Sequence, residues 1–101
     1  MILVRNLFRV KYGQAKPALE AFKNIREIAN RLGLSGARRV LTDVTGPAYT
    51  IVLEGEYESL TAFEQEGKTI RGNAEWRAMF DKFIPYVESG SREIFTVVDL
   101  K

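Results

Sequence analysis

The clearest hydrophobic pattern in the chain runs through residues 73–87, where apolar side chains recur at helical spacing. Their separations place them in one stripe along a helix. The stripe consists of Trp76, Met79, Phe80, Phe83, Ile84 and Val87. Asn73 is a favourable N-cap. Pro85 should end the helix near Ile84, because proline has no N–H and its ring clashes with the preceding turn. The rest of the chain must therefore supply a surface that buries this stripe.

Other segments alternate between apolar and polar residues, as strands do. In residues 2–12 one face carries Ile2, Val4, Asn6, Phe8 and Val10, and the other carries Leu3, Arg5, Leu7, Arg9 and Lys11. Residues 38–45 and 49–57 flank the turn at Gly46-Pro47 and predict a hairpin. The segment 91–100 is rich in β-branched residues and predicts the last strand.

A helix is predicted between the first two strands, with Pro17 in its first turn and Gly33 as its C-terminal stop. A short helix marked by Phe63, which Gly67 and Gly72 should break, precedes the helix that starts at Asn73. The order strand, helix, strand, strand, helix, strand predicts a ferredoxin-like α+β sandwich (βαββαβ). Its antiparallel four-stranded sheet carries helices on one face, and one domain spans residues 1–101.

The sheet face away from the helices is also apolar, because Leu3, Leu7 and Val52 lie on it. Either Phe95 and Val97 or Ile94 and Val98 must join them. The chain has no further element to cover this face, so we expect a homodimer through the face that carries Leu3 and Leu7.

Charged residues interrupt the same face. Arg5 and Arg9 on the first strand can pair with Glu54 and Glu56 on the third, since these strands are neighbours in the predicted order. Such residues can form a charged catalytic interior or interface salt bridges worth about 1 kcal/mol or less. We favour the salt bridges.

The first strand ends in Tyr12-Gly13 just before a long helix, and the segment EWRAMFDKFIPYV is followed directly by SREIFTVV. In these features the chain resembles the dimeric α+β barrel superfamily, and within it the NIPSNAP-like domains. The resemblance implies a cleft between sheet and helices in each subunit. Relatives include cofactor-free antibiotic monooxygenases and haem-degrading enzymes. The haem-degrading enzymes carry an iron-binding His at a position where this chain has Phe80. We therefore expect no His-ligated haem.

Asn6 interrupts an apolar face that should lie under the helices, and a buried amide without partners costs a few kcal/mol. It is either a catalytic polar group at the floor of the cleft, as in the monooxygenases that the chain resembles, or an amide bonded to nearby backbone. Trp76 either stacks on a flat ligand or is a core aromatic residue. Phe8 and Phe80 would line the same cleft. Tyr49 and Tyr57 share a strand face and either donate phenol hydrogen bonds there or are ordinary core or surface residues.

The amino-acid composition disfavours several kinds of binding site and partner. The chain has no His and no Cys, so we expect no structural zinc, no other metal and no cofactor. A net charge of +2 gives no reason to expect nucleic acid, and no run of about 18 apolar residues predicts a membrane span. Residues 1–12 alternate rather than forming the apolar block of a signal peptide, so we expect no export signal, and the lack of Cys is compatible with a cytoplasmic location.

The segment ILVRNL also resembles the first strand of RNA-recognition-motif domains, which stack bases on sheet aromatics. Leu3 and Pro47 stand where two of those aromatics would be, which disfavours RNA binding. The leading hypothesis is binding of a small hydrophobic or aromatic metabolite, with cofactor-free oxidation as its catalytic form. The rival is a non-catalytic dimerising or accessory domain. A cavity of about 300 Å³ or more would favour the first.

Overall fold

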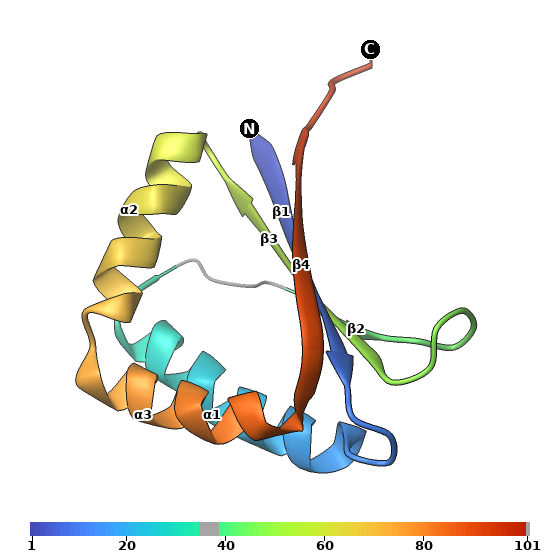
Figure 1. Ribbon diagram of the computed structural model, residues 1–101. Coiled ribbons are helices and arrows are strands. Elements are labelled where there is room, and N and C mark those ends of the chain that lie inside the picture. Colours follow the sequence, from blue (N-terminus) through green and yellow to red (C-terminus); the bar gives the residue numbers. More distant parts are fainter. Residues whose placement is uncertain (35–38, 101) are drawn as a thin grey trace.

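The computed structural model describes residues 1–34 and 39–100, which form a four-stranded antiparallel sheet with helices on one side (Figure 1). The elements are β1 (Ile2–Val10), α1 (Ala15–Arg31), β2 (Arg39–Thr42), β3 (Thr50–Tyr57), α2 (Leu60–Arg71), α3 (Ala74–Phe83), a 3-10 turn η1 (Ile84–Tyr86) and β4 (Val87–Thr96). The strand order is β2-β3-β1-β4. The predicted ferredoxin-like α+β sandwich is confirmed. Arg38, predicted to begin the second strand, lies outside the described residues.

The helix boundaries follow the signals in the sequence. The Asn73 side chain accepts a hydrogen bond from the Trp76 backbone N–H at 2.8 Å, which caps α3 as predicted. The regular helix ends at Phe83, and Pro85 lies in the 3-10 turn that follows. Gly33 has a φ of 71° after α1, the left-handed conformation that stops a helix.

Several boundaries were predicted wrongly, among them the ends of the first two strands, which lie at Val10 rather than Tyr12 and at Thr42 rather than Thr45. The helix α2 runs through Gly67 and ends only before Gly72, because glycine is tolerated inside a helix at a modest cost in stability. The last strand begins at Val87 rather than Ser91 and ends at Thr96 rather than Leu100. Its bounds follow its partner β1, since Val87 pairs with Val10 and Thr96 pairs with Ile2.

The core lies between the sheet and the pair α1 and α3. It is built from apolar side chains of both layers: Val10, Ala18, Phe22, Ile25, Ile51, Leu53 and Phe83. The Phe83 ring packs edge-on against Phe8 on β1, with ring centroids 5.3 Å apart. By contrast, α2 contributes no buried residue. Figure 1 shows it rising at one side of the sheet rather than lying across it.

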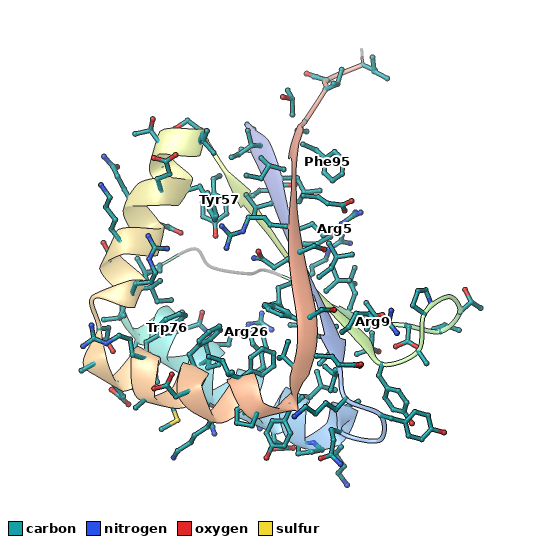
Figure 2. The ribbon with its side chains drawn as sticks, viewed as in Figure 1. Arg5, Arg9, Arg26, Tyr57, Trp76 and Phe95 are labelled. Carbon is teal, nitrogen blue, oxygen red and sulfur yellow. The ribbon has the colours of Figure 1, made fainter. Side chains whose placement is uncertain are left out.

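The other sheet face has no helix over it. Figure 2 shows Arg5, Arg9 and Phe95 on this side, away from the helices. Phe95 pairs with Leu3 across β4 and β1, which settles that Phe95 faces outward and its neighbour Ile94 faces the helices.

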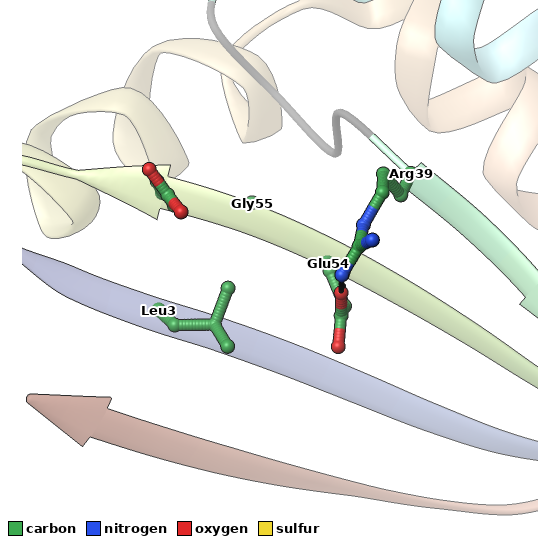
Figure 3. A pocket seen from close by; sticks show the side chains of 5 residues that line it. Leu3, Arg39, Glu54 and Gly55 are labelled. Carbon is green, nitrogen blue, oxygen red and sulfur yellow. Dashed lines mark hydrogen bonds and ion pairs between the residues drawn. The ribbon is translucent and has the colours of Figure 1, made fainter. Parts of the chain in front are cut away.

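Glu54 forms the centre of the charged group on this outward face. Its carboxylate accepts hydrogen bonds from Arg5 Nε at 2.9 Å and Arg39 Nε at 3.2 Å, and the residue is only 2% exposed. Figure 3 shows the Arg39–Glu54 pair beside Leu3. The predicted pairing of Arg5 with Glu54 is confirmed, and Glu93 adds a weaker contact to Arg5 at 3.8 Å.

Candidate functional site

A cleft of about 700 Å³ opens between the helix-facing side of the sheet and the helices α2 and α3. Most of its wall area is apolar or aromatic, and five charged side chains also line it: Arg26, Glu64, Glu66, Arg71 and Arg92. The side chains most relevant here are Asn6, Phe8 and Tyr57 from the sheet, Phe63 and Ile70 from α2, Trp76 and Phe80 from α3, and Arg92 from β4. The cleft lies between the sheet and α2, which is not packed directly against it. The Phe63 ring of α2 reaches the sheet, where it contacts Tyr57 on β3 and Arg92 on β4.

Five of the six residues proposed from the sequence line this cleft: Asn6, Phe8, Tyr57, Trp76 and Phe80. Tyr49 does not line it. It has a φ of 60°, which lies outside the strand region, and it precedes the start of β3. Its ring packs edge-on against Tyr12, with centroids 5.0 Å apart.

Asn6 has a side-chain partner instead of a nearby backbone group. Arg92 is directly opposite Asn6 in the β1–β4 register, and its Nε donates to Asn6 Oδ1 at 2.7 Å. The Arg92 guanidinium also lies over the Phe63 ring, 5.1 Å from the ring centroid. Arg92 was not proposed from the sequence, because the predicted β4 register was not anchored to β1. A correct register would have placed it beside Asn6.

The Trp76 indole is both a packing residue and a wall of the cleft. It is half-buried and stacks on Phe80, with centroids 4.9 Å apart and ring planes 11° from parallel. The indole Nε1 is buried, yet no hydrogen-bond acceptor contacts it among the described residues. Buried donors are nearly always paired in folded proteins. An acceptor on a bound molecule would reach this N–H only if the side chains that cover it move.

The Tyr57 ring packs edge-on against Phe63, with centroids 5.1 Å apart. Figure 2 shows Tyr57, Trp76 and Arg26 extending into the space between the helices and the sheet. These three side chains come from β3, α3 and α1, so three separate elements direct polar groups toward one region.

The strongest electrostatic feature lies on the opposite sheet face. Hydrogen bonds from Arg39 and then Arg5 lower the pKa of Glu54 below its ordinary value, although burial acts in the other direction. Among residues 1–34 and 39–100, no group of three His, Cys, Asp or Glu side chains is arranged to hold a metal ion. No helix in the described part of the chain is long and apolar enough to cross a membrane.

The sequence matches no protein-family model and no curated protein. The fold does match solved structures. An uncharacterized NIPSNAP domain protein from Burkholderia xenovorans superposes with a TM-score of 0.89 at 15% identity, covering 97% of this chain and 95% of that one. A NIPSNAP family protein from Agrobacterium tumefaciens gives 0.87 at 19% identity, covering 99% and 88%. The chain has the fold of NIPSNAP proteins.

The NIPSNAP-like fold extends to a second group. A structure of an antibiotic biosynthesis monooxygenase superposes with a TM-score of 0.74 at 14% identity, covering 98% of this chain and 100% of that one. The resemblance inferred from Tyr12-Gly13 and from residues 75–87 is therefore confirmed at the level of the fold.

Proposed function

We propose that this NIPSNAP-like chain binds a small aromatic or otherwise hydrophobic metabolite in the cleft between its sheet and α2. The observation that carries this proposal is the cleft itself, whose volume of about 700 Å³ lies within the range typical of small-molecule sites. An accessory domain without a ligand would be expected to fill this space with Trp76, Phe80 and Phe83. Instead Phe83 is buried in the core, and Trp76 and Phe80 form a wall.

The lining supports an aromatic ligand. The stacked pair of Trp76 and Phe80 offers a flat surface, and Phe63 with Tyr57 forms an edge-on pair at another wall. Aromatic rings favour such offset or edge-on contacts, worth about 0.5–1.5 kcal/mol beyond burial. The amide of Asn6 would orient the ligand through one of its oxygen atoms.

Cofactor-free oxidation of the bound ligand is a second candidate function. It is favoured by the Asn6 amide, whose NH₂ group is a donor in a mostly apolar cleft and would stabilise negative charge developing on a substrate oxygen. The substrate would supply all the electrons: its CH₂ group becomes C=O with one atom of O₂, and the second atom leaves as water. Asn6 would then be the catalytic residue, and no metal or other cofactor would take part.

We also propose that the chain is a homodimer through its outward sheet face. Leu41 and Phe95 are 38% and 45% exposed there, on the same sheet face as Leu3 and Leu7. A second copy would cover these side chains and shield the ion pairs of Glu54. A cytoplasmic location stays a prediction.

Native mass spectrometry of protein purified from its own host tests binding and assembly together. We expect a mass of twice 11.5 kDa plus a retained organic molecule. Trp76 is the only tryptophan, so its indole N–H gives a single resonance that reports on the cleft. Adding the extracted molecule back should move this resonance. A monomer mass would contradict the dimer, and an unmoved indole resonance would contradict binding in this cleft.

A further inference from the structure

We propose that the ligand of the cleft is an aromatic carboxylate and that Arg92 binds its carboxylate group. This inference rests on the proposed function, because it names the ligand class of the same cleft. It makes Arg92 a binding residue that determines specificity, and Asn6 its supporting partner.

The fold fixes the Arg92 side chain over the cleft. Arg92 is opposite Asn6 in the β4–β1 register, so it shares the helix-facing side of the sheet. Its Nε donates to Asn6 Oδ1 at 2.7 Å, and its guanidinium carbon lies 5.1 Å from the centroid of the Phe63 ring. A long side chain on an exposed edge strand would gain rotamer entropy by extending into water. Contacts to both β1 and α2 hold this one against the site instead.

The charge of Arg92 is not neutralised within the described part of the chain. Arg5 pairs with Glu54 and Glu93, and Arg31 pairs with Glu75. Arg92 makes no ion pair with a carboxylate of residues 1–34 or 39–100. Arg92 is exposed, so water screens part of its charge, but it lines a cleft whose surface is mostly apolar and can meet an anionic group that arrives from solution. Among the described lining residues, three arginines (Arg26, Arg71 and Arg92) outnumber two carboxylates (Glu64 and Glu66).

The remaining donors match a carboxylate. With Nε bonded to Asn6, the two terminal nitrogens of Arg92 form a planar fork that can donate to both oxygens of one carboxylate. Arginine is a donor only, so the oxygen of the Asn6 amide must face it. The Asn6 NH₂ group then has no partner in the described residues and adds a third donor on the floor of the cleft.

A second cation lines the same cleft from α2. The Arg71 guanidinium folds back along its helix over Gly67, where a Cβ atom would meet Arg71 Nη1 at 2.7 Å. The missing side chain of Gly67 therefore makes room for the head of Arg71 on the cleft side of the helix. Arg71 adds positive charge near an anionic ligand bound in the cleft.

Two probes of similar size and shape test the proposal: naphthalene-2-carboxylate, which is an anion with two acceptor oxygens, and naphthalene-2-carboxamide, which is neutral and has an NH₂ donor in place of one of them. Each is titrated into isotope-labelled protein while the single indole resonance of Trp76 is followed. We expect the carboxylate to bind about tenfold more tightly, as for a charge-assisted forked pair. Arg92→Gln should remove that difference, while carboxamide binding stays within about twofold. Arg92→Lys should keep part of the difference, because it retains charge without the fork.

Arg9→Gln is the matched control, since Arg9 is exposed on β1 but lies on the opposite sheet face. It should leave both affinities unchanged. Equal affinity of the wild-type protein for the two probes would overturn the carboxylate assignment and leave the aromatic cleft standing. A preference for the carboxylate that survives in Arg92→Gln would overturn the role of Arg92. If neither probe moves the indole resonance, the proposed function itself fails. The wild-type comparison needs no variant, so a folding defect in Arg92→Gln cannot obscure it.

Discussion

Replacing Trp76 with Phe separates the two contributions that its indole makes to the protein. The first is packing, because the ring stacks on Phe80 and touches the core cluster. The second is a cost, because the Nε1–H is buried without an acceptor among the described residues. Phe keeps a ring that can stack on Phe80 and removes the N–H. Ala removes both the ring and the donor.

In Trp76→Phe two changes in the free energy of unfolding have opposite signs: the cost of the unpaired N–H is recovered, and part of the apolar burial is lost. A buried donor left unpaired costs about 1–3 kcal/mol, which the variant recovers. The smaller ring loses apolar burial of about 1 kcal/mol at about 25 cal/mol per Å². We therefore expect the free energy of unfolding to stay constant or rise by about 1–2 kcal/mol, the difference of these terms. Trp76→Ala should cost about 2–3 kcal/mol, below the usual range for a fully buried aromatic residue because this indole is half-buried.

Urea unfolding followed by far-ultraviolet circular dichroism measures both variants without relying on the lost tryptophan. The result that refutes this reasoning is a loss in Trp76→Phe as large as that in Trp76→Ala. In that case the indole N–H would be satisfied in the free protein.

Three further variants test the sheet faces and the chemistry. Leu7→Asp should shift the protein toward monomer in light scattering, while the helix-facing core stays folded. Glu54 has a lowered pKa, so its ion pairs stabilise the fold above pH 4.5 and this contribution is lost as pH falls through the lowered value. Glu54→Gln should therefore reduce stability at neutral pH by about 1–3 kcal/mol and flatten its acid dependence. Asn6→Ala should abolish any oxygen uptake found in a screen of phenols and quinols, whereas activity that survives would place the chemistry elsewhere.

The order of elements could be read from the sequence because each periodic segment had to bury one face. The alternation in β1 and the stripe from Trp76 to Val87 require a helix layer on one side of a sheet. The bounds of β4 could not be read in the same way. They depend on pairing with β1, and the β-branched residues after Thr96 extend beyond the end of that partner. Local propensity alone cannot detect this limit.

The site was partly predictable for the same physical reason. Asn6 could be identified because a polar residue on a buried strand face needs a partner. That partner, Arg92, is 86 positions away and becomes apparent only when the strand register is known. Tyr49 was misplaced because its positive φ takes it out of the alternation that β3 follows. The volume of the cleft depends on how far α2 stands from the sheet, which no local pattern encodes.

Arginine side chains bond to carboxylates on one face of the sheet and to a neutral amide on the other. This difference connects the fold to its proposed functions. On the outward face Glu54 accepts hydrogen bonds from Arg5 and Arg39, and Glu93 adds a weaker contact to Arg5, so two carboxylates offset two guanidinium groups on the surface proposed to meet a second subunit. An uncompensated charge there would cost several kcal/mol on dimer formation. On the helix face Arg92 is bonded to a neutral amide, which fixes its position without cancelling its charge. A charge that is held in place but not neutralised is suited to bind an anion that arrives from outside the chain.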